Sequence, residues 1–467
     1  MNISPQMMQA HSISESKQRA GFVLLAFVQA TLIFTIALIM IPLPKIAAGF
    51  NLDSAQMLFL QVAYGLPFSG LLLFGGRLAD RFPERPMFLI GLSLFGLSSV
   101  AAAFAPSYDV LAAMRFIQGI GGAVTAPAAM AILRNIYPDP IRFGKAMAIW
   151  GGVSVLGATL GFVLSGIVTA WISWRWMFVV PVGVALTGLL LNRRLLPPSR
   201  PRNNDTKLQL DPLGALLATA AIVLTSYGLI RSGGQPWASP HVWIPLLAGL
   251  LLLIVFLLLE QRMKSPLLPP RFLLGANRAV GLIGMLLAAA GSMLIELLPS
   301  LYLQQVRGWS ALTTALSFLP LIIALLVANH FTSPLVYRLG ARKVTIAGFL
   351  IAAAGLFLYS WLHCETGYLL GMVPGQILVS VGIAFVFSGS AVMSTSNVPE
   401  HQAGLTGGVM NTAMELGPTI GLAIFMSVAG LRADIVEGYA LAFAAGTGIY
   451  LLVAILLMFL LERTGSH

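Results

Sequence analysis

Three ionisable side chains lie within long apolar stretches of the sequence, where they could exchange protons or bind ions. Glu415 lies in the stretch 403–430, Glu296 in 278–300 and Arg115 in 108–133. Burial away from water disfavours the charged form of a carboxyl group, so such a group can take up and release protons near neutral pH. Ionisable groups at membrane depth are costly and are often functional. We therefore predict that Glu415 is the first proton carrier and Glu296 the second.

Each of the three residues also has other interpretations. Glu415 could be a structural hydrogen-bond partner of a neighbouring helix, Glu296 could reach the outer membrane interface, and either carboxylate could attract a cationic substrate. Arg115 cannot realistically lose its proton. It could bind a carboxylate, polarise a proton site or pair with helix carbonyl groups. We favour a role in proton coupling for all three.

A polar segment, GGRLADRFPERP at 75–86, separates two apolar stretches. Asp80 can accept hydrogen bonds from a helix N-terminus and pair with Arg81 or Arg85. A cluster that forms in one conformation and breaks in another is what a gate requires. The alternative is a set of solvated charges that only fixes membrane orientation. We call Gly76, Asp80, Arg81 and Arg85 the latch loop.

These residues must be positioned by membrane-spanning helices. Hydrophobic residues make up 58% of the chain and charged residues 9%, whereas soluble domains have about 25% charged residues. The apolar stretches do not alternate with polar residues as the strands of a membrane β-barrel would. The sequence therefore predicts an all-α membrane protein. About fourteen stretches approach or exceed the length needed to cross a bilayer: 21–43, 55–75, 87–105, 108–133, 143–170, 174–192, 211–231, 241–260, 278–300, 310–330, 343–361, 368–395, 403–430 and 438–461.

The distribution of basic residues predicts the orientation. Most of the 27 lysine and arginine residues fall in segments on one side of this helix map, and such an excess marks the cytoplasmic side. The net charge of +11 is scattered through short loops, which favours membrane orientation over nucleic-acid binding. We expect an integral protein of a bacterial-type cytoplasmic (inner) membrane, with both termini in the cytoplasm.

Polar breaks and internal repetition divide the chain into two halves. The segment YRLGARK at 337–343 follows the tenth stretch, as the latch loop follows the second. Gly157 and Gly161 are spaced four residues apart in the fifth stretch, as are Gly417 and Gly421 in the thirteenth. Small residues at this spacing allow close helix packing, and we predict that they also form a sliding seam between the halves. The expected division is a cytoplasmic tail at 1–20, a six-helix bundle at 21–192, a linker at 193–210, two central helices at 211–260, a linker at 261–277, a six-helix bundle at 278–461 and a cytoplasmic tail at 462–467.

With these features the sequence resembles the major facilitator superfamily, and specifically its fourteen-span drug:proton antiporter branch. The resemblance implies two six-helix bundles plus two extra central helices, alternating access, and a latch loop that holds the outward-facing state. It also implies that Arg115 belongs to the coupling machinery. The matching residues are Gly76, Arg77, Leu78, Ala79, Asp80, Arg81 and Arg85, then Arg115, Gln118, Gly119 and Gly121, and finally Ser173, Trp174, Arg175, Trp176, Met177 and Phe178.

The sequence departs from the family pattern in three places. Pro83 and Glu84 stand where a glycine and a basic residue are usual, and Phe162 follows Gly161 where a proline is usual. Thr35 lies near the place where exporters of cationic drugs often carry an acidic residue. The absence of that acid predicts hydrophobic or weakly charged substrates rather than dications.

We therefore expect a proton-coupled antiporter that exports small amphipathic or drug-like compounds. The sequence has no GxxxxGK[ST] run that would indicate a nucleotide site, and no metal-ligand cluster, so we expect no cofactor, no metal, no enzymatic activity and a proton gradient as the energy source. The expected partners are a small-molecule substrate and the lipid bilayer, without nucleic acid, and the resemblance implies a monomer. The alternatives are a dedicated metabolite, siderophore or lipid exporter, a proton symporter that imports, and a non-transporting membrane sensor.

Overall fold

The computed structural model describes residues 15–199, 211–232, 235–263, 266, 275–396 and 403–464. These residues form helices and no strand, so the predicted all-α fold class is confirmed. Thirteen of the described helices are long and apolar enough to cross a membrane. Helix α7 adds a long helix with a shorter apolar segment, Leu156–Trp171. Each of the fourteen predicted stretches coincides with a helix of the structure.

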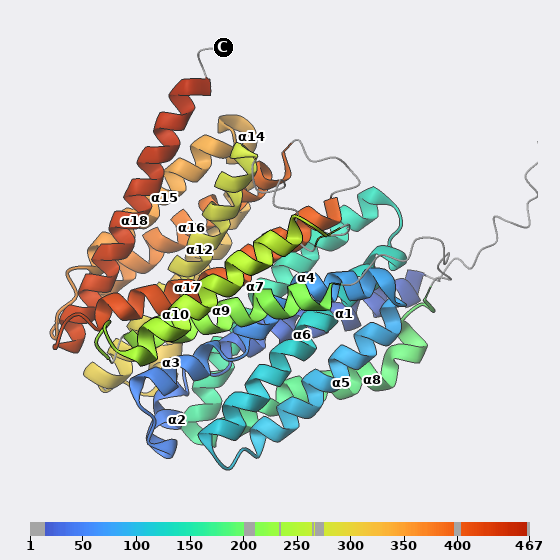
Figure 1. Cartoon of the computed structure of the whole chain (residues 1–467), viewed down its shortest axis with the longest axis horizontal. Coiled ribbons are helices and arrows are strands. Elements are labelled where there is room, and N and C mark those ends of the chain that lie inside the picture. The colour runs from blue at the N-terminus through green and yellow to red at the C-terminus, as the bar shows by residue number, and fades with distance from the viewer. Residues whose placement is uncertain are drawn as a thin grey trace, which may run out of the picture.

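The N-terminal half holds the first six predicted spans (Figure 1). Two of these spans are interrupted, the second between α3 and α4 and the sixth between η2 and α8. Its elements are α1 (Glu15–Ala37), α2 (Leu43–Phe50), α3 (Ser54–Val62), α4 (Gly65–Arg81), α5 (Glu84–Ala103), α6 (Tyr108–Ile136), α7 (Pro140–Trp171), the 3₁₀ turn η2 (Trp174–Phe178) and α8 (Val179–Leu195).

The C-terminal half holds the last six spans, and two further helices lie between the halves in sequence. The central helices are α9 (Pro212–Ser232) and α10 (Pro240–Glu260). The C-terminal elements are α12 (Ala276–Leu301), the π turn η3 (Tyr302–Val306), α13 (Ala311–Leu316), α14 (Leu319–Leu339), α15 (Ala341–Tyr359), the π turn η4 (Tyr368–Met372), α16 (Val373–Thr395), α17 (Ala403–Ala429) and α18 (Ile435–Thr464).

Polar side chains cap the N-termini of several helices. Asp53 and Gln56 form a capping box at α3, Ser107 caps α6 and Asp139 caps α7. At α9, Asp211 Oδ1 accepts a hydrogen bond of 2.8 Å from the backbone N–H of Gly214, and Pro212 occupies the first turn. These caps satisfy backbone N–H groups that have no partner within the helix.

The two halves repeat one packing motif, in which glycines bring two helices into close contact. A Cβ atom on Gly121 of α6 would lie 2.8 Å from the backbone oxygen of Gly91 of α5. A Cβ atom on Gly382 of α16 would lie 2.5 Å from the backbone oxygen of Gly348 of α15. Any larger residue would push the helices apart at these points. The contacts occur at corresponding helices of the two halves, which supports the internal duplication inferred from the sequence.

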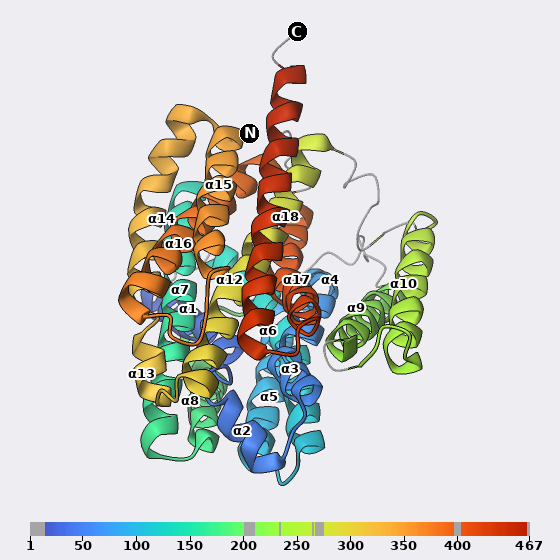
Figure 2. The same cartoon turned by 90° about the vertical axis from the view of Figure 1, so that its left-hand side faces the viewer.

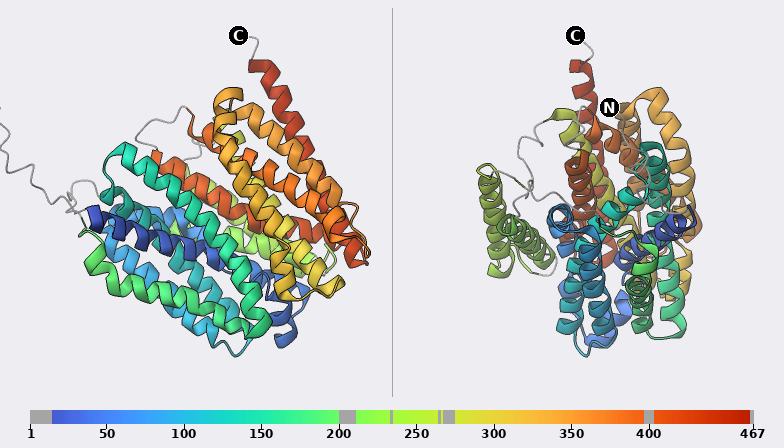
Figure 3. Two further views of the ribbon diagram at one scale, coloured as in Figure 1. Left: turned by 180° about the vertical axis from the view of Figure 1, so that it is seen from behind. Right: turned by 90° about the vertical axis from the view of Figure 1, so that its right-hand side faces the viewer.

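We call the face of the molecule at which α1 begins the inner face, and the opposite face the outer face. One continuous cluster of buried apolar residues joins both halves at the outer face, through residues that include Leu43, Leu60, Leu301 and Phe318, and continues through the core of the C-terminal half. Toward the inner face, a second cluster is built from the N-terminal half alone. A small third cluster belongs to α12 and α17, with Leu73 of α4 packed against it. Figures 1 and 3 show the helices of the two halves meeting near α2 and α3 and diverging toward the opposite end.

The central helices form a hairpin on the flank of the molecule (Figure 2). Helix α9 contacts α4 of the N-terminal half and α17 of the C-terminal half, while α10 packs on α9. At the outer end of α9, Arg231 lies 3.7 Å from Asp53, and the Ser232 hydroxyl is hydrogen-bonded to that of Ser427 in α17. The hairpin is therefore attached to both halves at the outer face.

Candidate functional site

Arg115 of α6 is fully buried in the N-terminal half. Its Nη1 donates hydrogen bonds of 3.0 Å to the backbone carbonyl of Thr35 in α1 and 3.0 Å to Oε1 of Gln118, one turn along α6. The guanidinium carbon lies 5.1 Å from the ring centroid of Tyr64, which precedes α4. Arg115 therefore connects three helices of the bundle through one charged group.

The neighbours of Arg115 extend the polar network to a fourth helix. The side-chain amide of Gln118 donates a hydrogen bond of 2.6 Å to the hydroxyl of Ser99 in α5. The hydroxyl of Tyr64 donates one of 3.1 Å to the backbone carbonyl of Leu32 in α1. We call Thr35, Tyr64, Ser99, Arg115 and Gln118 the Arg115 cluster. The sequence flagged Thr35 only as a departure from the family pattern and gave no signal for Tyr64 or Ser99, because their places in the cluster depend on helix packing.

The charge of Arg115 is only partly satisfied. Its Nε and Nη2 atoms are buried and have no hydrogen-bond partner among the described residues. No described carboxylate pairs with it either, since its hydrogen bonds go to a carbonyl and an amide. A buried cation without an anionic partner is costly. The guanidinium of Arg115 can therefore bind an anionic group that enters the site, or repel a cationic one.

Glu296 lies in α12, between the buried residues Ile295 and Leu297. Its side chain is half-buried. In the part of the chain that the structure describes, no hydrogen bond or ion pair joins Glu296 to another residue. An ionised carboxylate at membrane depth is unfavourable unless it is paired or solvated. Glu296 is therefore suited to bind a proton or a cationic group.

Glu415 lies in α17, and its side chain is outside the described residues. Helix α17 packs closely against α12. The two predicted proton carriers thus belong to neighbouring helices of the same half, while Arg115 belongs to the other half.

The latch loop is mostly helical, which corrects the prediction of a polar loop at 75–86. Helix α4 continues through Arg81 and α5 begins at Glu84, so only Phe82 and Pro83 lie between them. Arg77 to Arg81 are compatible with a helix, and the chain turns only at Pro83, which lacks a backbone donor. The latch residues Gly76, Asp80 and Arg81 therefore belong to α4, and Arg85 belongs to α5.

The described hydrogen bonds of this segment hold it to its own half and to the linker after α10. Arg85 donates to Oδ1 of Asn192 in α8, from Nε at 3.2 Å and from Nη2 at 2.8 Å. Arg77 donates to the backbone carbonyl of Pro266. Glu84, the acid found where the family has a base, accepts a hydrogen bond of 2.7 Å from the Asn135 side chain in α6. In this conformation, none of these three side chains bridges to a described residue of the C-terminal half.

The four glycines of the predicted seam pack within the halves rather than between them. A Cβ atom on Gly157 would lie 2.3 Å from the backbone oxygen of Ala30, and one on Gly161 would lie 2.8 Å from the Cβ of Ala37, both in α1. A Cβ atom on Gly417 or Gly421 would meet α12 in the same way. The spacing of the glycines allows close approach of helices, but it does not say which helix approaches. Helix α7 contacts the other half at the residues that follow Gly161.

That contact is made by Gly166 and Phe162. A Cβ atom on Gly166 would lie 2.3 Å from the Cβ of Ala315 in α13 of the other half. The ring of Phe162 lies 5.5 Å from that of Phe318, which precedes α14. Phe162 is the residue that replaces the usual proline, so this departure from the family pattern contributes directly to closure of the outer face.

Comparison with known proteins identifies the family. A model of the Major Facilitator Superfamily matches residues 23–422, with a second match at 280–467. The chain belongs to the Major Facilitator Superfamily. It is 32% identical to the puromycin resistance protein pur8 of Streptomyces alboniger over 461 residues, which cover 95% of this chain and 91% of the relative. It is 34% identical to the cephamycin export protein CmcT of Amycolatopsis lactamdurans over 431 residues, covering 91% and 88%.

A solved structure shows the same fold. The POT family transporter PepTSo superposes with a TM-score of 0.68 at 16% identity, covering 96% of this chain and 98% of that one. In a superfamily protein, contact between the halves at one face and divergence at the other correspond to one state of alternating access. Both halves close the outer face and diverge toward the inner face (Figure 1), so the structure corresponds to the state that is open at the face where α1 begins.

Two glycine substitutions in α7 should therefore have different effects. Gly157→Leu should lower the free energy of unfolding, by about 1–3 kcal/mol, because it overpacks the α1–α7 contact inside one half. Gly166→Leu should instead hinder closure of the outer face, because its side chain would enter α13. We expect it to lengthen the distance between spin labels at Phe104 and Leu431, exposed positions on the outer face of the two halves.

These measurements require a background in which Cys364, which is exposed, is replaced by serine. Gly183→Leu is the control, because a Cβ atom there has no neighbour within 4 Å. The assignment of Gly166 to the contact between halves fails if Gly157→Leu changes the label distance and Gly166→Leu does not.

Proposed function

We propose that this transporter exports small amphipathic or drug-like compounds in exchange for protons, by alternating access of the two bundles. The substrate is transported without chemical conversion, and the proton gradient supplies the energy with no cofactor. Protons enter and leave through Glu296 and Glu415, and Arg115 responds to their charge from the other half. The latch residues Gly76, Asp80, Arg81 and Arg85 stabilise the outward-facing state, in which the inner face is closed.

The observation that carries this proposal is the environment of Glu296. It is a carboxyl group in a membrane-spanning helix, half-buried, with no described hydrogen bond or ion pair. Such a group is stable when it is neutral and unfavourable when it is charged and unpaired. Protonation can therefore shift the equilibrium between two arrangements that expose it to different surroundings.

The direction of transport and the class of substrate are supported by the relatives. The two proteins compared above are named for puromycin resistance and cephamycin export, and both match nearly the whole chain. Most lysine and arginine residues fall on the side of the helix map that holds both termini, which supports a cytoplasmic location for both termini. We further propose that the chain works as a monomer in a bacterial-type inner membrane, since each half already has its counterpart within the chain.

Flux in inverted membrane vesicles tests the proposal. Vesicles containing the protein should accumulate dyes or antibiotics when the vesicle lumen is more acidic than the medium. A protonophore should abolish the accumulation. Empty vesicles are the control. Uptake that persists at full rate without a gradient would contradict proton coupling, and failure to move any member of a broad panel would contradict drug export.

Glu296→Gln tests the observation directly. Glutamine has nearly the same shape but cannot carry a charge, so we expect gradient-driven flux to fall at least ~10-fold while the protein remains folded. Glu365→Gln is the matched control, because this residue is exposed between α15 and η4. Full coupling in Glu296→Gln would remove Glu296 from the proton path.

A narrower function is the second candidate. The two relatives are each named for one compound, which supports a dedicated exporter of one metabolite as the alternative to a multidrug transporter. The same vesicle assay separates the two, since a dedicated exporter would move one chemical class and leave the rest of the panel untouched.

A further inference from the structure

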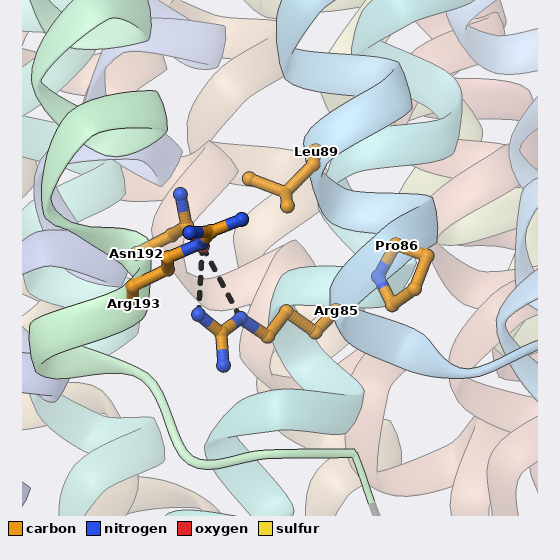
Figure 4. A pocket seen from close by; sticks show the side chains of 5 residues that line it. All are labelled: Arg85, Pro86, Leu89, Asn192 and Arg193. Atoms are coloured by element: carbon orange, nitrogen blue, oxygen red, sulfur yellow. Dashed lines mark hydrogen bonds between the residues drawn. The ribbon is translucent and has the colours of Figure 1, made fainter.

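A groove opens at the inner face between the first turn of α5 and the last turn of α8 (Figure 4). Its volume is about 450 Å³. Arg85, Pro86 and Leu89 of α5 form one wall, and Asn192 and Arg193 of α8 form the other. The groove lies on the periphery of the N-terminal half, away from Glu296 and the Arg115 cluster. Apart from Arg85, which belongs to the latch loop, its lining residues have no role in the function proposed above.

The groove is positively charged and its first arginine is held in place. Asn192 Oδ1 accepts both hydrogen bonds from Nε and Nη2 of Arg85 (Figure 4), and the Asn192 amide in turn bonds the backbone carbonyl of Leu189. This leaves Nη1 of Arg85 without a hydrogen bond to a described residue. The lining includes no acidic residue, and the carboxylate of the adjacent Glu84 bonds Asn135 of α6 instead.

The second arginine is exposed and free to move onto a ligand. Arg193 has no hydrogen bond or ion pair with a described residue. Two guanidinium groups on facing helices, one fixed and one adaptable, can both donate hydrogen bonds to the oxygens of a phosphate group between them.

Beyond the groove, α5 and α8 carry exposed apolar side chains that are suited to contact the bilayer. Ile90 and Leu97 of α5 are 57% and 70% exposed, and Leu186 and Leu190 of α8 are 55% and 68% exposed. These side chains cover the outside of two membrane-spanning helices. An acyl chain can lie along them while a polar group occupies the groove at the membrane surface.

We propose that this groove binds the headgroup of an anionic phospholipid. The phosphate accepts hydrogen bonds from Arg85 and Arg193, and the acyl chains extend along α5 and α8. Because two positive charges face no acid in the lining, a lipid with net negative charge is preferred over a zwitterionic one. Basic pockets between helices at the cytoplasmic side are suited to such headgroups. The site depends on the orientation inferred above, but not on the substrate or on proton coupling.

Native mass spectrometry of the purified full-length protein tests the site. Phosphatidylglycerol and phosphatidylcholine are titrated into the parent, Arg193→Gln and Arg194→Gln. We expect the parent to bind phosphatidylglycerol in preference to phosphatidylcholine, and Arg193→Gln to weaken the binding of phosphatidylglycerol roughly fivefold. Arg194 is the matched control, because it is the adjacent exposed arginine and does not line the groove. Arg85 is left unchanged because it belongs to the latch loop.

Leu89→Trp is a second variant that fills the groove without changing its charge, and it should weaken binding to a similar extent. The proposal is overturned if Arg193→Gln and Arg194→Gln have equal effects, or if Leu89→Trp binds as the parent does. It is also overturned if the parent does not distinguish the two lipids. Displacement of the lipid by millimolar inorganic phosphate or glycerol 3-phosphate would instead assign the groove to soluble phosphate compounds.

Discussion

Replacing Arg115 with methionine should abolish gradient-driven transport and leave the protein folded. Methionine fills much of the same volume without a charge. The substitution loses the hydrogen bonds to the Thr35 carbonyl and to Gln118, but it also removes the cost of burying a cation that has no described carboxylate partner. These effects oppose each other, so we expect the free energy of unfolding to stay within about 2 kcal/mol of the parent value. Thermal unfolding in detergent and vesicle flux measure the two consequences separately.

The conservative variant Arg115→Lys distinguishes charge from geometry. Lysine keeps the positive charge but cannot reproduce the planar set of donors that reaches both Thr35 and Gln118. We expect weak but proton-dependent flux, whereas Arg115→Met should have none. Arg19→Met is the control, because Arg19 is an exposed arginine near the start of α1. A stable Arg115→Met variant with normal coupled flux would remove Arg115 from the coupling machinery. Loss of folding in Arg115→Met would show instead that the Arg115 cluster is structural.

The helices could be predicted because each one must satisfy the same physical requirement along a continuous stretch of sequence. Crossing a bilayer needs about 20 apolar residues with internal hydrogen bonds, and this pattern depends on no distant residue. The start of α9 at Asp211 and Pro212 was predictable for a related reason, because a cap and its first turn are local. Local signals also have a limit, since the polarity of Arg77, Asp80 and Arg81 suggested a loop where α4 in fact continues.

Contacts between helices could not be predicted in the same way. Gly157 and Gly166 lie in the same helix and are both small, yet one meets α1 and the other meets α13 of the opposite half. Likewise, the sequence indicated that Arg115 is buried, but not that Tyr64 and Ser99 surround it. Which residues meet depends on the tilt and rotation of each helix. Packing against neighbouring helices sets both, and hydropathy does not.

The central helices show the same limit at a larger scale. Their sequence is compatible with a simple spacer, but the structure attaches α9 to both halves at the outer face, through Arg231 and Asp53 on one side and Ser232 and Ser427 on the other. The outer ends of the two halves must separate if the outer face is to open. At least one of these contacts must then change. The hairpin therefore contributes to the free-energy difference between the two states.

Replacing Glu415 with glutamine should uncouple transport from the proton gradient. Glu415 is the predicted first proton carrier and lies in α17, which packs against the helix that holds Glu296. Glutamine keeps the shape and much of the hydrogen-bonding capacity of glutamate but cannot carry a negative charge. We expect gradient-driven flux in inverted vesicles to fall at least ~10-fold, with thermal stability close to that of the parent. Glu437→Gln is the control, because this residue is exposed in the first turn of α18.

The double variant Glu296→Gln/Glu415→Gln shows whether the two carboxyl groups act together. If they form one proton path, the first substitution already interrupts it, and the double variant should be no slower than the more damaged single variant. If each group carries its own proton, the losses should multiply, and each single variant should exchange one proton fewer per substrate than the parent does. Full coupling in Glu415→Gln together with loss of coupling in Glu296→Gln would place the proton site on α12 alone. The reverse result would place it on α17. Glu296, which has no described partner, would then serve to attract a cationic substrate.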